Sequence, residues 1–146
     1  MEKTKVLDVK SDLFINELAK KLMTIKEIEM PRWAMFVKTS AGAERPPMQN
    51  DWWYKRVASI LRKSYLKGIV GVSRLRRAYK RKKKIKVWPA RPYLASGKII
   101  RVIFQKLEDA GLMEKVEKPK KGRVLTKKGL ELLEKTAGEL AKTKEK

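Results

Sequence analysis

The chain has 146 residues, 42% of them hydrophobic, and a formal net charge of +22 from 38 Lys and Arg against 16 Asp and Glu. It contains no Cys and no His, which excludes disulfides, thiol nucleophiles, zinc fingers and the commonest general base. No apolar run reaches the roughly 20 residues of a membrane span and the N-terminus lacks a signal-peptide pattern, so we expect a cytoplasmic protein.

The first predicted helix covers residues 11–29. Ser11 can cap it, apolar residues then recur at helical spacing, and a proline stops it. Residues 31–51 contain Gly and a Pro-Pro pair, which cannot form a regular helix. We therefore expect a long loop here, held in place by Trp33 and Phe36.

A second helix is predicted from residue 52 to 67, with Asn50 or Asp51 as its cap and Gly68 at its end. At about 100° per residue, its two faces differ in character. The apolar face consists of Trp53, Val57, Ile60 and Leu61. The opposite face is basic, and we expect Trp52 to project among its cations.

Residues 71–79 fit a short helix with Val72, Leu75 and Tyr79 facing inward. Residues 80–86 are nearly all charged and predict a loop, and the prolines that follow keep the chain extended.

The next helix begins at Ser96 or Gly97 and ends at Gly111. Its buried stripe consists of Ile100, Ile103, Phe104 and Leu107. Residues 112–117 and 123–126, separated by a turn, have the length and composition of a two-stranded hairpin. Thr126 can cap a last helix, with Leu130, Leu133, Ala137 and Leu140 as its inner face.

This order of elements predicts a mainly α, winged helix-turn-helix-like domain with a small β-hairpin wing and an extra N-terminal helix. The helix at 96–110 would be the recognition element, and the turn at 118–122 the tip of the wing. We expect one domain over residues 1–142, followed by a frayed basic tail at 143–146.

The positive charge is concentrated in the middle of the chain. Residues 52–107 contain eighteen basic residues and no acidic one, whereas residues 1–51 and 108–146 carry net charges of only +1 and +3. Such a density destabilises a chain by self-repulsion, whereas phosphates would neutralise it and release condensed counterions. The pattern indicates a polyanionic partner, since a solvated surface needs charges of mixed sign.

The candidate nucleic-acid-contacting residues lie on the three basic helices, the charged loop and the wing. They are Lys55, Arg56, Arg62, Lys63, Arg74, Arg76, Arg77, Lys80, Arg81, Lys82, Lys83, Lys84, Trp88, Arg91, Lys98, Arg101, Lys106, Lys120 and Lys121. The candidates for stacking on unpaired bases are Trp52, Tyr54, Tyr65 and Trp88. Trp88 is the best of them, because it lies beside a proline in a basic, irregular segment. No catalytic spacing, metal-ligand set or cofactor motif occurs, so we expect a protein that is not an enzyme and has no small-molecule substrate.

Four blocks resemble the small-subunit ribosomal protein S19e family of archaea and eukaryotes: MPRWAMFVKTSAGAERPP at 30–47, DWWYKRVASILRKSYLKGIVGVSRLRRAYK at 51–80, ASGKIIRVIFQKLEDAGLMEK at 95–115, and GRVLTKKG at 122–129. The resemblance implies a structural protein of the subunit head that binds ribosomal RNA, contacts neighbouring small-subunit proteins, and supports subunit assembly and translation. It implies no catalysis, and we expect a monomer when isolated.

Within these blocks, Arg62 and Arg101 are the positions most strongly implied as RNA contacts, supported by Lys55, Arg56, Arg77 and Lys98. Residues 80–94 depart from the family, which has a glycine-containing loop and a Pro-His pair in that region. The alternative class is a DNA-binding winged-helix transcriptional regulator. It is disfavoured because no dimerisation helix is evident and the charge extends well beyond one recognition helix.

Overall fold

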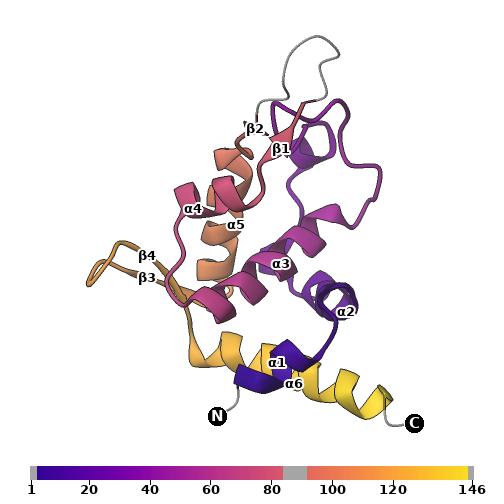
Figure 1. Cartoon of the computed structure of the whole chain (residues 1–146), viewed down its shortest axis with the longest axis vertical. Helices are drawn as coiled ribbons and strands as arrows, with labels where there is room; N and C mark the ends of the chain where they lie inside the picture. The colour runs from indigo at the N-terminus through magenta and orange to yellow at the C-terminus, as the bar shows by residue number, and fades with distance from the viewer. Residues whose placement is uncertain (1–2, 84–91, 145–146) are drawn as a thin grey trace.

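The computed structural model describes residues 3–83 and 92–144, with side chains over 6–83 and 92–142. These residues form six α-helices and two small antiparallel sheets (Figure 1). No helix among them is long and apolar enough to cross a membrane.

The helices follow the chain in the order α1 (Lys3–Asp8), α2 (Ser11–Met23), α3 (Trp52–Lys67), α4 (Val72–Ala78), α5 (Gly97–Asp109) and α6 (Lys127–Lys144). Two 3-10 turns, η1 (Lys26–Ile28) and η2 (Arg32–Met35), lie between α2 and α3. Strand β1 (Arg81–Lys82) pairs with β2 (Pro92–Tyr93), and β3 (Met113–Val116) pairs with β4 (Gly122–Leu125).

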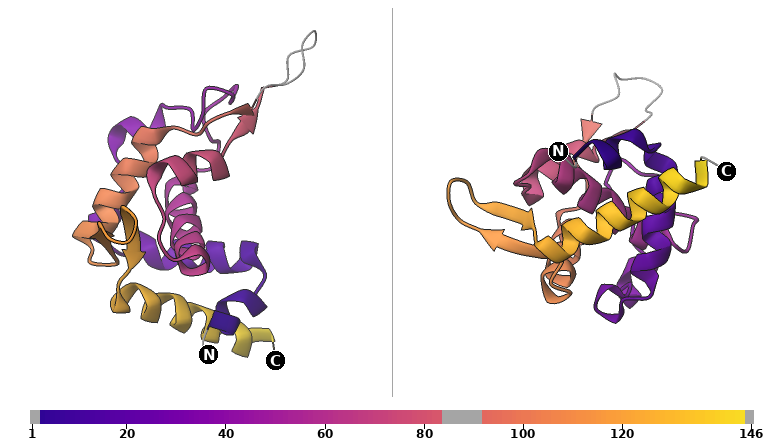
Figure 2. Two further views of the ribbon diagram at one scale, coloured as in Figure 1. Left: turned by 60° about the vertical axis from the view of Figure 1, so that its left-hand side comes forward. Right: turned by 90° about the horizontal axis from the view of Figure 1, so that it is seen from below.

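Helix α3 lies at the centre of the molecule, between α2 and the α4–α5 pair (Figure 1). Its predicted apolar face is confirmed, because Trp53, Val57, Ile60 and Leu61 are all fully buried. Helix α6 packs against α1, α2 and α3, and Figure 2 shows it crossing the base of the molecule. The mainly helical, winged-helix-like prediction is confirmed.

The second helix and the recognition helix end as predicted, each next to a glycine in the left-handed region. Gly68 follows α3 with φ of 69°, and Gly111 follows the C-cap of α5 with φ of 68°. The predicted buried stripe of α5 is confirmed at every position. The buried stripes of both helices belong to one core, so their basic faces lie on the outside of it.

The first helix differs from its prediction. Helix α2 ends at Met23, not at residue 29, because the Thr24 hydroxyl donates to the Lys21 carbonyl at 2.7 Å and Ile25 is then extended. The chain continues into η1, and the carbonyl of Ile28 accepts the indole N–H of Trp53 at 3.2 Å. The helical spacing of the apolar residues continues across this break, which explains the overlong prediction.

The start of the chain also differs from expectation. Ser11 is the first residue of α2 and not its cap, since Lys10 occupies the N-cap position and no side chain caps the helix. Helix α1 was not predicted. It packs against α6, and Val6 is fully buried, so α1 depends on long-range packing and not on local signals.

The loop before α3 is only partly as predicted. Trp33 is half-buried and meets the ring of Trp53 edge-on, with centroids 6.1 Å apart. Phe36, however, is 80% exposed and holds nothing in place. Trp52 was predicted to project among the cations, but it is 9% exposed and packs edge-on against Trp53 at 5.7 Å.

The hairpin prediction is confirmed, with Met113 opposite Leu125 and Val116 opposite Gly122. We call residues 113–125 the wing, which Figure 2 shows extending away from the helices. Thr126 caps α6 as predicted, because its Oγ1 accepts the backbone N–H of Gly129 at 3.3 Å.

Two chain segments were predicted as irregular and prove partly regular. Residues 81–82 of the expected loop form β1, whose partners are Tyr93 and Pro92. Helix α6 continues to Lys144, so it includes the first half of the expected tail at 143–146.

Candidate nucleic-acid interface

The ring of Tyr79, directly after α4, brings two cations of α3 together. The Arg56 guanidinium carbon lies 4.1 Å from the ring centroid, and the Lys63 ammonium lies 4.0 Å from it. Ser59, between them on the same face of α3, shares a 2.7 Å hydrogen bond with the Tyr79 hydroxyl. Lys63 also donates to the Ser59 hydroxyl at 3.2 Å. We call these four residues the Tyr79 cluster.

The Tyr79 cluster is electrostatically unbalanced. Burial lowers the pKa of Arg56; Tyr79 raises it in part, and the nearby charge of Arg81 lowers it again. Burial also lowers the pKa of Lys63, followed by repulsion from Arg56 and Arg62. No ion pair within the described part of the chain includes Arg56 or Lys63. An anion bound here would stabilise both charged forms.

A hollow beside the Tyr79 cluster suits an anion. Arg62 does not line it, and the Nε of that half-buried side chain is enclosed without a hydrogen-bond partner. The hollow, of about 790 Å³, is lined by Arg56 and Ser59 of the cluster, by Arg81 and Lys82 of β1, and by the carboxylate of Glu44. Oxygen atoms entering the hollow would therefore meet cations from two elements.

Several predicted contact residues have partners within the protein. Lys55 forms a 2.9 Å ion pair with Asp51, and Arg76 donates through Nε to the Ala95 carbonyl at 2.9 Å. Lys106 is half-buried and lies 3.4 Å from the Glu27 carbonyl, to which it donates. These side chains connect elements of the fold as well as adding positive charge.

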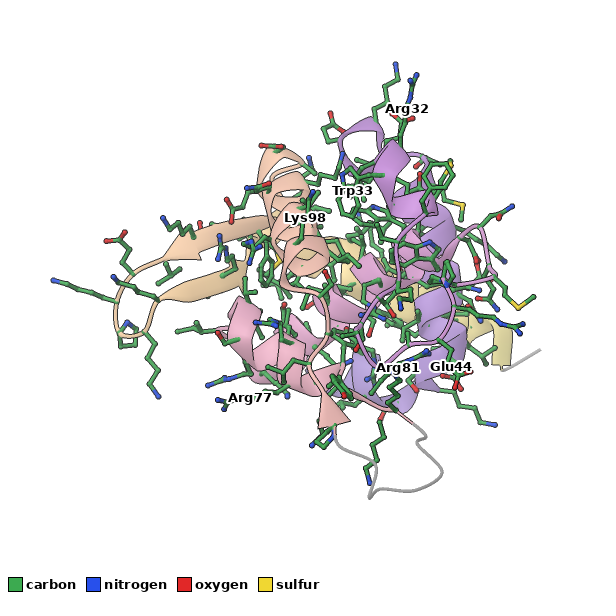
Figure 3. The ribbon with its side chains drawn as sticks, turned by 90° about the horizontal axis from the view of Figure 1, so that it is seen from above. Arg32, Trp33, Glu44, Arg77, Arg81 and Lys98 are labelled. Carbon is green, nitrogen blue, oxygen red and sulfur yellow. The ribbon has the colours of Figure 1, made fainter. Side chains whose placement is uncertain are left out.

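Other predicted residues are exposed. They are Arg74, Arg77, Lys80, Arg81, Lys82, Lys83, Lys98, Arg101, Lys120 and Lys121. Figure 3 shows Arg77 pointing outward from α4, whereas Lys98 lies beside Trp33, with its ammonium 4.9 Å from that ring. The predicted residues therefore do not form one compact site. They are spread over a broad basic surface.

The start of α5 brings two arginines close together. A Cβ added at Gly97 would lie 3.0 Å from Nη1 of Arg101 and 3.3 Å from Cδ of Arg76. A side chain at this position would therefore push the two arginines apart.

The family model described as ribosomal protein S19e matches residues 5–143. The chain belongs to the ribosomal protein S19e family.

Curated relatives extend the match across archaea and eukaryotes. The small ribosomal subunit protein eS19 of Thermoplasma volcanium is 43% identical over 136 residues, covering 92% of this chain and 87% of that protein. That of Haloarcula marismortui is 42% identical and covers 91% of this chain and 88% of its own length. That of Entamoeba histolytica is 38% identical over 140 residues, which are 96% of this chain and 88% of that protein.

Three residues predicted as contacts in this S19e chain, Lys84, Trp88 and Arg91, lie outside the described residues. In the part of the chain with described side chains, no group of three or more Asp or Glu could hold a metal ion.

The sequence did not single out Tyr79 as a platform for cations, nor Lys67, which lines a groove together with Lys120 and Lys121 of the wing. Tyr79 sits at the end of an apolar stripe, where a core role is the ordinary expectation. Its contacts with α3 depend on how two helices pack, and nothing local in the sequence specifies them.

Proposed function

We propose that this S19e chain is a structural constituent of the small ribosomal subunit head, where it binds ribosomal RNA through the basic surface of α3, α4, α5 and the wing. In this role it supports subunit assembly and translation without catalysing a reaction. Its partners are ribosomal RNA and neighbouring small-subunit proteins, and the isolated protein is a monomer. The names of the relatives support the ribosomal part of the proposal.

The Tyr79 cluster is the observation that best supports RNA binding. Arg56 and Lys63 are brought together and partly desolvated without a carboxylate between them, an arrangement that costs stability in the free protein. RNA phosphates supply negative charge from outside the chain and release counterions on binding. Because cations lie on several elements, the surface suits an irregular folded RNA better than a single DNA groove.

The first experiment asks where the protein resides in cells. Cell extract is sedimented through a sucrose gradient, and we expect the protein to travel with the small ribosomal subunit. Recovery only at the top of the gradient would contradict the proposal.

A second experiment tests the Tyr79 cluster directly. The variant Arg56→Gln/Lys63→Gln should bind small-subunit ribosomal RNA more weakly than Lys127→Gln/Lys135→Gln, a control that removes two exposed charges from α6. Competition between the RNA and duplex DNA of equal length distinguishes an RNA-binding ribosomal protein from a DNA-binding transcriptional regulator. Tighter binding to one DNA sequence than to RNA would favour the regulator.

A further inference from the structure

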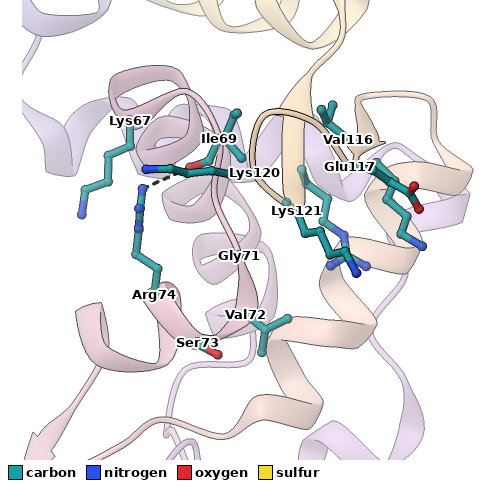
Figure 4. A pocket seen from close by; sticks show the side chains of 13 residues that line it. Lys67, Ile69, Gly71, Val72, Ser73, Arg74, Val116, Glu117, Lys120 and Lys121 are labelled. Atoms are coloured by element: carbon teal, nitrogen blue, oxygen red, sulfur yellow. Dashed lines mark hydrogen bonds between the residues drawn. The ribbon is translucent and has the colours of Figure 1, made fainter.

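A groove of about 730 Å³ separates the wing from the segment that joins α3 to α4. Figure 4 shows Lys67 and Arg74 on one side of the groove and Lys120 and Lys121 on the wing opposite. The groove lies apart from the Tyr79 cluster, since none of the four cluster residues lines it.

The base of the groove is fixed by backbone pairing. Val70 N–H donates to the Arg123 carbonyl at 3.0 Å, and Arg123 N–H donates to the Val70 carbonyl at 2.8 Å. The approach is close because residue 122 is glycine: a Cβ there would lie 2.4 Å from Cγ2 of Ile69. The two walls are therefore held in a defined relation to each other.

The charge of the groove is strongly positive on both walls. Lys67, Arg74, Lys120 and Lys121 are all exposed, and Arg74 is further oriented by donating to the Ile69 carbonyl at 3.3 Å. Among the described residues that line the groove, Glu117 is the only carboxylate. Arg123 is neutralised by a 2.8 Å ion pair with Glu108, so the net positive charge comes mainly from the two rims.

The chemistry of the lining distinguishes between two kinds of anionic chain. Ile69, Val72 and Val116 give the groove apolar surface between its charged rims. An extended acidic peptide could not bind here by adding a strand at Val70 and Arg123, because the backbone groups of these residues are already bonded to each other. A nucleic-acid strand needs no such partners, because its phosphates contact side chains and its sugars and bases contact apolar surface.

We propose that this groove binds the phosphodiester backbone of an RNA strand, with Lys67 and Arg74 on one side of the strand and Lys120 and Lys121 on the other. The proposal rests on the RNA-binding function proposed above and adds a second site to it.

The test uses the full chain and a fluorescein-labelled oligouridylate of about ten nucleotides, within the usual range for a single-strand site. One variant, Lys120→Gln/Lys121→Gln, removes charge from the wing. Its control is Lys127→Gln/Lys135→Gln, which removes the same charge from α6. Fluorescence anisotropy over a series of salt concentrations gives the slope of log affinity against log salt for each protein.

A second pair of variants blocks the groove without changing its charge. Gly71 lines the groove in an extended conformation, and a Cβ built there meets nothing within 4 Å. Gly71→Phe therefore adds bulk to the groove, and Gly71→Ala is its control. If Gly71→Phe melts at a lower temperature than Gly71→Ala, it disturbs the fold and a second bulky variant is needed. Ser73→Trp then replaces it, because Ser73 also lines the groove and is exposed.

We expect the wing variant to flatten the salt slope by about 1.4, because each single-strand phosphate that is no longer neutralised reduces the slope by about 0.7. The α6 control should leave the slope unchanged. Gly71→Phe should weaken oligouridylate binding several-fold relative to Gly71→Ala.

The groove proposal is overturned if the wing variant matches the α6 control and the bulky variants bind as well as Gly71→Ala. It is also overturned if the bulky variants weaken binding of an oligoglutamate peptide of equal length while oligouridylate binds as before, because the occupant is then an acidic protein segment. Either result overturns the groove proposal but leaves the proposed RNA-binding function intact. That function is contradicted by a different result, namely that the unmodified protein binds no ribosomal RNA.

Discussion

Ser59 and Tyr79 join the middle of α3 to the end of α4 through a 2.7 Å hydrogen bond between their hydroxyl groups. The bond fixes the orientation of the Tyr79 ring. Both Arg56 and Lys63 make cation–π contacts with this ring. The ring therefore sets the spacing of two cations that would otherwise repel each other. Attraction to an aromatic face contributes about 0.5 to 2 kcal/mol per contact, more when the cation is desolvated.

The ring of Tyr79 should matter more for RNA binding than its hydroxyl. Tyr79→Phe removes only the bond to Ser59 and should lower the free energy of unfolding by about 1 kcal/mol, with RNA affinity retained. Tyr79→Leu also removes the aromatic face and should weaken RNA binding. Urea unfolding and RNA anisotropy measure the two effects, and equal RNA affinity in both variants would show that the ring does not position the cations.

Lys63 should titrate at lower pH than an exposed lysine, whose ordinary pKa is 10.5, because burial and then the charges of Arg56 and Arg62 disfavour its protonated form. Between the lowered pKa and 10.5, the unfolded chain binds more protons than the folded one, so the contribution of Lys63 to stability rises with pH. The difference in unfolding free energy between wild type and Lys63→Met isolates this contribution.

Lysine side-chain NMR checks the same prediction without unfolding. Arg62→Gln should raise the pKa of Lys63, because one repelling charge is removed. Bound RNA should also raise the pKa of Lys63, because its phosphates stabilise the protonated form. A Lys63 signal that titrates with the exposed lysines would contradict the lowered pKa.

Arg62→Ala and Arg101→Ala should both weaken RNA binding, and Arg101→Ala should change the free energy of unfolding by no more than about 0.5 kcal/mol. Arg101 is exposed, whereas Arg62 is half-buried, so its truncation also removes packing of the aliphatic part of its side chain. Arg76→Ala should behave differently, because it removes the bond to the Ala95 carbonyl and costs about 1.5 to 3 kcal/mol. Thermal unfolding ranks the three variants, and a large loss for Arg101→Ala would identify it as a structural residue.

Gly122→Ala should destabilise the protein by about 1 to 3 kcal/mol, because its Cβ would overlap Ile69 and lie 2.9 Å from the Val70 carbonyl. Gly138→Ala is the matched control, since a Cβ there meets nothing within 4 Å and α6 gains about 0.5 to 1 kcal/mol of helix propensity. The free energy of unfolding, measured with a denaturant, should therefore decrease for Gly122→Ala and increase for Gly138→Ala. A stabilised Gly122→Ala would show that the wing can move away from the segment before α4.

The elements that local chemistry determines could be predicted from the sequence. Gly68 and Gly111 mark helix ends, Thr126 caps α6, and the stripe of α5 follows the helical period. The break after Met23 could not be predicted, because the apolar spacing continues through it and the chain beyond it bonds to Trp53, 25 residues further on, through the Ile28 carbonyl.

The candidate interface was predictable in composition but not in geometry. The absence of acidic residues over 52–107 indicates an anionic partner, but no local pattern shows which cations meet. Arg56 and Lys63 converge on Tyr79, whereas Arg76 and Lys106, of similar appearance in the sequence, are bonded to backbone carbonyls. That distinction depends on how α3, α4 and α5 pack.

The pairing of Val70 with Arg123 has a consequence for the behaviour of the protein before it meets RNA. A short exposed hairpin has an open outer strand that can pair with the strand of a second molecule and begin aggregation. Here the outward N–H and C=O of Arg123, in the middle of β4, are already bonded to Val70. We therefore expect the β4 edge of the wing to resist edge-to-edge association between copies of this chain, even where high salt screens the repulsion between their positive charges.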